Sequence, residues 1–370
     1  MQYRKFGNTG VQVSALGFGC MRLPLLEDKV TVDEKEAVKI IRHAIDQGVN
    51  YIDTAYPYHN GTSECIVKKA LEDGYRDKVY VADKSPVWKL EKEQDFDDIL
   101  EEQLQKLGTD HIDFYLLHAL SRERFEEKVK KFNLLDHMKA AREAGKIKYL
   151  GFSFHGDLET FKEIVDYTDE WDFCQIQYNY INLDYQAGDE GLHYAADKGL
   201  GVIIMEPLLG GRLANLSSHV AEVFSKEKTA VEHALDFLWN QKEVSLLLSG
   251  MGAEQQVKDN LAYADRSSIG MLTEEELAAY GKAKAIYDKT SMVDCTGCAY
   301  CMPCPFGLNI PELFKTYNLF GLRGKEAAKA AYDKFEVRSD ACKSCHRCEK
   351  ECPQNISISQ VMTKIAQLLG

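Results

Sequence analysis

Short, nearly continuous apolar runs alternate with longer stretches of helical spacing through most of the chain. Apolar runs of this kind are typical of parallel strands that are buried on both faces. Stretches in which apolar residues recur every three or four positions predict amphipathic helices. The eight strand candidates are Ala15–Met21, Val49–Thr54, Val79–Lys84, Ile112–His118, Tyr149–Phe154, Phe173–Tyr178, Gly201–Met205 and Ser245–Ser249. The helix candidates between and after them are Thr31–Gln47, Phe96–Leu107, Phe132–Ala144, Leu158–Val165, Gly188–Lys198, Ala230–Asn240 and Ala253–Ala264.

Eight strand candidates, nearly all followed by a helix, predict an α/β protein with a closed (β/α)8 TIM barrel. Residues 1–16 precede the barrel and predict an N-terminal β-hairpin, with its turn at Gly7–Gly10. The alternative is an open doubly wound sheet, which would usually show fewer units and a glycine-rich phosphate loop after its first strand. Here the first strand candidate leads into Pro24 and opens no helix, which favours the barrel.

The cysteines divide the chain near residue 290, because eight of the eleven lie between Cys295 and Cys352. We therefore expect a barrel domain over residues 1–287 and a small, mainly helical iron–sulfur domain over residues 288–370. Helical spacing within the second domain is seen in Ile310–Tyr317 and Gly324–Phe335. The N-terminus leads into no apolar export signal, so the clustered cysteines indicate metal ligation in the cytoplasm rather than disulfides.

The spacing of these cysteines predicts two 4Fe–4S clusters. The second motif, Cys342-x2-Cys345-x2-Cys348-x3-Cys352-Pro353, has the bacterial ferredoxin spacing, in which the fourth cysteine ligates the other cluster. The first motif, Cys295-x2-Cys298-x2-Cys301-x2-Cys304-Pro305, is one residue shorter in its last gap. We expect Cys295, Cys298 and Cys301 to share one cluster with Cys352, and Cys342, Cys345 and Cys348 to share the other with Cys304. Zinc is the alternative, but zinc sites use pairs of CxxC rather than triplets followed by Cys-Pro.

Charge and hydropathy limit the partners that we expect. The net charge of -13 argues against nucleic acid and anionic membrane surfaces. No apolar run approaches the roughly 18 residues that a membrane span requires. A small-molecule substrate and a redox protein partner remain as expectations.

Polar side chains stand at the ends of three successive strand candidates, namely Asp53, Lys84 and His118, and Tyr58 follows in a nearby loop. Taken singly, Asp53 and Lys84 could form a structural ion pair, and His118 could be a histidine at the barrel rim. Together they suit an acid site, since an ammonium lowers the pKa of a tyrosine from its ordinary value of about 10. Such a phenol could protonate a carbonyl oxygen while hydride arrives at the carbonyl carbon.

Several motifs make the chain resemble the aldo-keto reductases over about residues 1–285. These are Asp53-Thr54-Ala55, Tyr58, Gly61-Thr62-Ser63-Glu64, Lys84, Lys106–Asp110, Ile112–His118, Gly145–Lys148 and Gly151-Phe152-Ser153. The resemblance implies a barrel oxidoreductase that reduces a carbonyl compound with NADPH or NADH. It implies that Tyr58 is the general acid, that Lys84 and Asp53 tune it, and that His118 orients the carbonyl. The tail resembles helical ferredoxin-type modules, and barrel reductases with such a tail form a recognisable subgroup.

The resemblance also implies nucleotide contacts. Ser153 and Gln175 match positions that bind the nicotinamide amide, and Leu209, Gly211 and Arg212 could bind the pyrophosphate. After the last strand, the matching positions are Gly250, Gln256 and Asn260. Gln256 stands where an arginine is usual, and the loss of that cation leaves the choice between NADP and NAD open.

The role of the tail is open at this point. A nicotinamide passes a hydride, whereas each cluster passes one electron, and the sequence shows no flavin site that would couple the two. The clusters could be structural, could dock a redox partner or could deliver electrons to the substrate. The alternative function is an iron–sulfur electron-transfer protein whose barrel mainly binds nicotinamide nucleotide.

Overall fold

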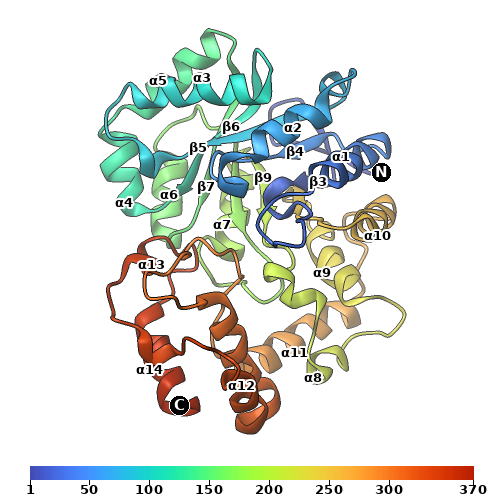
Figure 1. Cartoon of the computed structure of the whole chain (residues 1–370). Coiled ribbons are helices and arrows are strands. Elements are labelled where there is room, and N and C mark those ends of the chain that lie inside the picture. The colour runs from blue at the N-terminus through green and yellow to red at the C-terminus, as the bar shows by residue number, and fades with distance from the viewer. The chain divides into compact units, whose positions relative to one another are not determined.

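The computed structural model describes all residues, 1–370, and divides them into two compact units (Figure 1). The first unit comprises Met1–Pro207 and Leu235–Leu272, and the second comprises Leu208–Ala234 and Thr273–Gly370. The boundary that we expect near residue 287 stays a prediction. No helix combines the length and the apolar composition that a membrane span requires.

The first unit contains a closed barrel of eight strands, and every neighbouring pair in it is parallel. This confirms the predicted (β/α)8 fold. The strands, in chain order, are β3 (Leu16–Gly19), β4 (Tyr51–Asp53), β5 (Tyr80–Ser85), β6 (Ile112–Leu120), β7 (Ile147–Phe154), β8 (Phe173–Gln177), β9 (Gly201–Met205) and β10 (Val244–Ser249).

Helices follow these strands, and all of them except one of three residues bury apolar side chains. They are α1 (Glu34–Asp46), α2 (Ser63–Leu71), α3 (Asp95–Leu107), α4 (Arg122–Arg124), α5 (Leu134–Glu143), α6 (Leu158–Asp166), α7 (Gly188–Asp197), α9 (Ala230–Trp239) and α10 (Glu254–Asp265). Helix α1 begins later than the predicted Thr31, because the Asp33 side chain accepts a hydrogen bond from the Glu36 backbone N–H and caps the helix there.

An N-terminal hairpin closes the end of the barrel at which the strands begin. Its strands β1 (Tyr3–Lys5) and β2 (Gln12–Ser14) pair antiparallel, as predicted. Phe6 is fully buried, and its ring centroid lies 4.8 Å from that of Phe114 and 5.6 Å from that of Phe173. Gly7 has a φ of +50°, and a Cβ built there would lie 2.3 Å from the backbone nitrogen of Gly201. The hairpin therefore seals this end, and the opposite end, where the strands finish, is left for chemistry.

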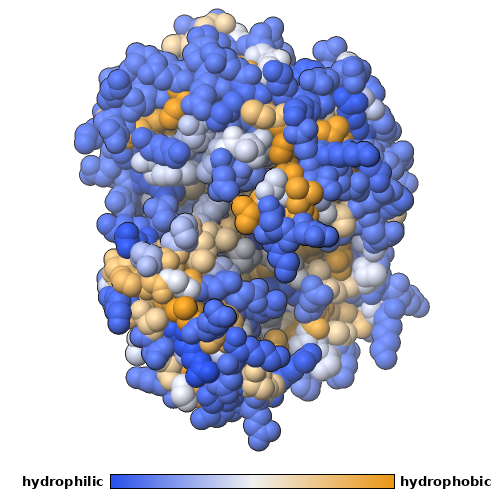
Figure 2. Space-filling model, in the orientation of Figure 1, coloured by the Kyte–Doolittle hydropathy of each residue, from blue (hydrophilic) through white to orange (hydrophobic).

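The second unit has a helical core of its own. Its helices are α8 (Ser218–Ala221), α11 (Glu274–Thr290), α12 (Ile310–Tyr332), α13 (Arg347–Lys350) and α14 (Ile358–Leu369). The two helices predicted at 310–317 and 324–335 form one long element, which is kinked at Gly324, where φ is +81°. Leu313, Phe314, Met362 and Ile365 are almost completely buried between α12 and α14. Hydrophilic residues cover most of the face seen in Figure 2.

Replacing Phe6 with alanine tests whether the hairpin plug stabilises the barrel. We expect Phe6→Ala to lower the free energy of unfolding by about 3–5 kcal/mol, because it leaves a cavity among buried aromatic rings. Val30→Ala, at a residue that is 63% exposed, is the control and should cost less than about 0.5 kcal/mol. Denaturant unfolding followed by tryptophan fluorescence measures both. Equal losses of unfolding free energy in Phe6→Ala and Val30→Ala would show that the packing of Phe6 does not stabilise the barrel.

Candidate functional site

The four residues of the expected acid site lie close together at one end of the barrel. Asp53 ends β4, Lys84 lies near the end of β5, His118 lies near the end of β6, and Tyr58 begins a short 3-10 turn, η2 (Tyr58–Gly61). Strands β4, β5 and β6 are consecutive parallel neighbours, so their carboxyl ends meet at one edge. All four side chains are buried.

Lys84 is the centre of this group. Its Nζ lies 2.7 Å from each carboxylate oxygen of Asp53 and 2.7 Å from the backbone oxygen of Thr54. An ammonium has three N–H donors, so each of them finds an acceptor. The Lys84 side chain is completely buried, and a charge in such a place is tolerated only when it is paired in this way.

A polar network behind Lys84 fixes its backbone, and the sequence reasoning did not identify it. The Lys84 N–H donates to Asp83 Oδ1 over 2.8 Å, and Gln103 Nε2 donates to the Lys84 oxygen over 3.1 Å. The same Gln103 nitrogen donates to Glu64 Oε1 over 3.2 Å. Burial, and then the nearby carboxylate of Glu64, raises the pKa of Asp83 well above its ordinary value. In the sequence, only the position of Asp83 directly before Lys84 could have indicated this network.

Tyr58 contacts this charged pair through its ring. The Nζ of Lys84 lies 5.0 Å from the Tyr58 ring centroid. We expected the ammonium to lower the pKa of Tyr58, but in the structure burial, assisted by the carboxylate of Asp53, raises that pKa well above 10. The reason is that Asp53 already neutralises Lys84, so desolvation of the phenolate prevails. Tyr58 is therefore a protonated donor throughout the physiological pH range.

His118 is a neutral imidazole at the same end of the barrel. Its ring centroid lies 6.2 Å from that of Tyr58 and 5.1 Å from that of Trp88. Burial, and then the nearby charge of Lys84, holds the pKa of His118 well below 6.5. Its Nδ1 is buried with no hydrogen-bond partner in the protein. A neutral imidazole has one N–H donor, and His118 can thus donate to a ligand oxygen without carrying charge.

The residues expected to hold the nicotinamide are buried in adjacent strands of the barrel, Ser153 in β7 and Gln175 in β8. Ser153 Oγ accepts a hydrogen bond of 2.7 Å from the Ala119 N–H. Gln175 Nε2 lies 3.5 Å from the sulfur of Met205, and Gln175 Oε1 has no hydrogen-bond partner. A buried amide oxygen without a partner is costly, and a bound amide group would satisfy it.

A cation that the sequence reasoning overlooked, Arg22, lies against the turn after β10. A Cβ built on Gly250 would lie 3.1 Å from Cβ of Arg22, whose exposed side chain therefore lies against this turn. Gln256 Oε1 accepts from the Gly252 N–H over 2.9 Å, and Asn260 Nδ2 donates to Ser249 Oγ over 3.0 Å. Gln256 and Asn260 thus fix the turn itself. Arg22 lies far away in sequence, so no local motif indicated it.

Leu209, Gly211 and Arg212 belong to the second unit, in the 3-10 segment η6 (Leu209–Ala214). Leu209 is fully buried, and Gly211 has a φ of +88°. The Arg212 guanidinium pairs with Asp294 over 3.2 Å, donates to Ser291 Oγ over 2.8 Å and lies 4.8 Å above the Tyr287 ring. Because these contacts already use Arg212, its expected role at the nucleotide pyrophosphate stays a prediction.

The eight clustered cysteines surround two separate small cavities of the second unit. Cys295, Cys298, Cys301 and Cys352 line one cavity. Cys304, Cys342, Cys345 and Cys348 line the other. No group of three or more His, Cys, Asp or Glu side chains lies close enough together to hold a single metal ion. Each set of four thiols, drawn from both motifs, is the donor set that a 4Fe–4S cluster takes.

Comparisons with known proteins give a family for each part of the chain. Residues 15–279 match the model described as the aldo/keto reductase family, and residues 294–357 match the model described as a 4Fe-4S dicluster domain. An L-galactose dehydrogenase of Arabidopsis thaliana is 29% identical over 295 residues, which cover 73% of this chain and 91% of the relative. The aldo-keto reductase YhdN of Bacillus subtilis is 31% identical over 223 residues, covering 58% of this chain and 64% of the relative.

Solved structures share the fold. Aldo-keto reductase AKR11C1 from Bacillus halodurans, in its holo form, has a TM-score of 0.65 at 24% identity and covers 76% of this chain and 96% of its own. An aldo/keto reductase from Klebsiella pneumoniae, in complex with NADP and acetate, has a TM-score of 0.62 at 25% identity and covers 76% of this chain and 94% of its own.

The buried pair Asp53–Lys84 gives a stability test. We expect Asp53→Asn to lower the free energy of unfolding by about 3–5 kcal/mol, because it leaves the Lys84 ammonium without its counterion. The double variant Asp53→Asn with Lys84→Met should regain part of that loss, because no buried charge is then left. Denaturant unfolding measures both variants. The exposed pair Glu34–Lys69 is the control, and Glu34→Gln should cost less than about 1 kcal/mol. A double variant less stable than Asp53→Asn would contradict the pairing argument.

Proposed function

This chain belongs to the aldo/keto reductase family, and from that premise we propose that it reduces a carbonyl compound with a nicotinamide nucleotide and with Tyr58 as general acid. The observation that carries the proposal is the fully buried Lys84 ammonium, held by Asp53 and Thr54 and placed 5.0 Å from the Tyr58 ring. A neutral His118 beside the same ring completes the group.

The geometry supports proton transfer from Tyr58 to a substrate oxygen. When hydride adds to a carbonyl carbon, negative charge develops on the oxygen, which becomes a much stronger base than the phenolate. Tyr58 holds its proton until then, because its raised pKa keeps the phenol intact. As the proton leaves, the Lys84 ammonium 5.0 Å from the ring offsets part of the cost of a buried phenolate, and Asp53 keeps that ammonium in place. His118 donates its N–H to the same substrate oxygen and orients the carbonyl.

Ser153 and Gln175 suit the carboxamide of a nicotinamide, because Gln175 Oε1 is a buried acceptor that needs a donor. When bound, a reduced nicotinamide supplies the hydride. Related structures from Klebsiella pneumoniae are complexes with NADP and with NADPH. Arg22 beside Gly250 provides a cation for a nucleotide phosphate, which favours NADP over NAD for this chain.

Residues 294–357 form a 4Fe-4S dicluster domain, and we propose the two cysteine sets described above as its ligands. The Cys352 thiol then completes the first set, and the Cys304 thiol completes the second. Thiolate ligands have to stay reduced, which favours a cytoplasmic location. We propose that this module serves electron transfer or structural support.

Replacing Tyr58 with phenylalanine tests the general acid. We expect Tyr58→Phe to lower kcat/KM for aldehyde reduction by about 10²–10⁴-fold, because only the donated proton is lost. Nucleotide affinity, measured by fluorescence titration, should hardly change. Tyr56→Phe is the matched control, since the Tyr56 hydroxyl donates to Glu102 instead. Wild-type rates in Tyr58→Phe would contradict the proposal. Cluster reduction by NADPH or NADH, with no carbonyl turnover in the wild type, would favour the electron-transfer alternative.

Removing one thiol from each set tests the proposed cluster ligands. In Cys352→Ala, we expect Cys295, Cys298 and Cys301 to become reactive toward an alkylating agent under anaerobic conditions. The thiols of the other set should stay protected. Cys304→Ala should give the reverse pattern, and mass spectrometry of alkylated peptides distinguishes the two. Alkylation of Cys342, Cys345 and Cys348 in Cys352→Ala would show that Cys352 does not belong to the first cysteine set. Cys65→Ala, at an exposed cysteine outside both sets, is the control.

A further inference from the structure

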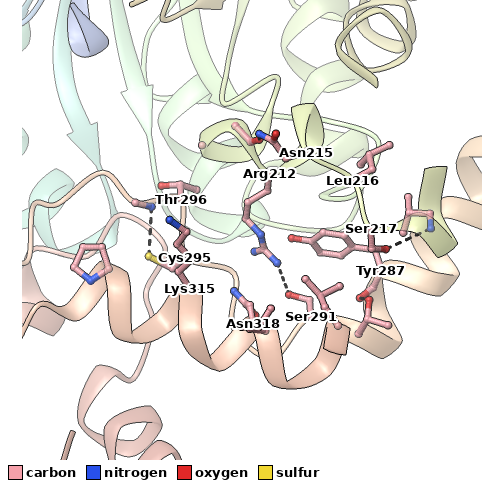
Figure 3. Close-up of a pocket in the computed structure, with 18 of the residues that line it drawn as sticks. Arg212, Asn215, Leu216, Ser217, Tyr287, Ser291, Cys295, Thr296, Lys315 and Asn318 are labelled. Atoms are coloured by element: carbon pink, nitrogen blue, oxygen red, sulfur yellow. Dashed lines mark hydrogen bonds between the residues drawn. The ribbon is translucent and has the colours of Figure 1, made fainter. Parts of the chain in front are cut away.

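The second unit contains a cavity that no residue of the acid site lines (Figure 3). Its lining includes Cys295 of the first cysteine set, together with Gly211 and Arg212, which are expected at the nucleotide pyrophosphate. Its volume is about 660 Å³, within the range of small-molecule sites. It lies among the segment 210–220, the end of α11 and the first half of α12, all of which belong to the same compact unit.

Close backbone contacts and buried hydrogen bonds hold this cavity open. A Cβ built on Gly210 would lie 2.0 Å from the Thr296 oxygen, so only glycine allows the two segments to approach each other. Asn318 Oδ1 accepts from the N–H groups of Met292 and Val293 over 2.9 and 3.0 Å, and its Nδ2 donates to the Val293 oxygen over 2.8 Å. The walls are therefore fixed before any ligand binds, which lowers the cost of binding.

The lining combines an apolar wall with a few donors. Leu216, Val220, Leu319 and Leu322 supply the apolar surface. The Cζ atom of Arg212 lies 4.8 Å from the centroid of the Tyr287 ring, and both residues line the cavity together with Lys315 (Figure 3). A planar guanidinium, an aromatic ring and leucine side chains suit a flat conjugated ring, whose carbonyl or other acceptor groups would accept from the lysine or arginine.

This cavity adjoins the first cysteine set. Cys295, Thr296 and Pro311 line both the 660 Å³ cavity and the cavity of Cys295, Cys298, Cys301 and Cys352. One residue layer thus separates a ligand in the larger cavity from a group held by these four thiols. A redox-active ligand at this position would be close enough to exchange electrons with a cluster held by the first cysteine set.

We propose that the cavity binds a flat, redox-active ring with carbonyl acceptors, of the quinone or flavin class, and that this ring exchanges electrons with the 4Fe–4S clusters. The proposal rests on the cysteine ligation proposed above and not on the Tyr58 chemistry. A reduced ring of this class releases two electrons and two protons when it is oxidised. Each oxidised cluster takes up one electron, so two clusters accept both, and the two protons pass to water.

Binding to the anaerobically purified, full-length holoprotein tests the proposal. We titrate it with flavin mononucleotide and separately with menadione, and equilibrium dialysis measures the bound fraction. Saturation at one molecule per chain is expected for at least one probe, and the arm that saturates distinguishes the flavin class from the quinone class. Saturation with neither probe would overturn the proposal.

Two variants place the ligand in this cavity. Leu319→Trp fills it with an indole, and we expect the dissociation constant to rise at least about tenfold. Leu277→Trp is the matched control, because Leu277 lies on α11, is 43% exposed and does not line the cavity. Lys315→Gln removes an exposed lining cation with little risk to folding and should weaken binding several-fold. Iron content verifies that each variant is loaded. Unchanged affinity in both Leu319→Trp and Lys315→Gln would overturn the assignment.

Cluster reoxidation tests the electron exchange separately. After reduction with dithionite and its removal, the oxidised ring that binds should restore the cluster absorbance with one ring per two clusters. The rate of reoxidation should rise with the concentration of the ring and level off as binding saturates. It should be slower in Leu319→Trp than in Leu277→Trp. Equal rates in these two variants would contradict exchange from the cavity. Carbonyl reduction by the wild type without added ring tests only the proposed reductase function. A failure of the reductase proposal can therefore be told apart from a failure of the cavity proposal.

Discussion

The ion pair between Lys84 and Asp53 is the constraint on which the acid site depends. A lysine with no exposed surface has to be paired, and here two carboxylate oxygens and the Thr54 oxygen satisfy all three of its N–H groups. The pair joins the ends of β4 and β5 and fixes the place of the charge beside Tyr58. The same neutralisation explains why burial keeps Tyr58 protonated. In the function that we propose, Tyr58 gives up this proton only when a stronger base forms next to it.

The two compact units provide for two kinds of redox chemistry. The barrel unit brings Asp53, Tyr58, Lys84 and His118 together at its strand ends, and we propose that it transfers a hydride. The second unit surrounds two spaces with cysteines and is matched to a 4Fe-4S dicluster domain, which suits the transfer of single electrons. The cavity beside Cys295 is the place where we propose that a ligand exchanges two electrons with the two clusters. The missing coupling group then has a candidate site that lies outside the barrel.

Much of this could be predicted from the sequence, because it depends on periodicity and spacing. The eight apolar runs indicated the barrel, and the residues at their ends indicated Asp53, Lys84 and His118. The cysteine spacing predicted two sets of four, and these same sets line the two small cavities, while their ligation of clusters stays a prediction. What depends on distant contacts could not be predicted. The direction of the Tyr58 pKa follows from burial, Arg22 reaches Gly250 only in the folded chain, and segment 208–234 joins the tail through tertiary contacts that no local pattern encodes.

We propose above all that the barrel transfers a hydride to a carbonyl carbon. The most direct measurement is a single anaerobic turnover with reduced nicotinamide nucleotide that carries deuterium at C4 on one face or on the other. The account predicts one deuterium on the carbinol carbon of the product, from only one of the two labelled forms. A product that has gained its carbon-bound hydrogen from solvent with both forms would contradict it, because the electrons would then have arrived without a hydride.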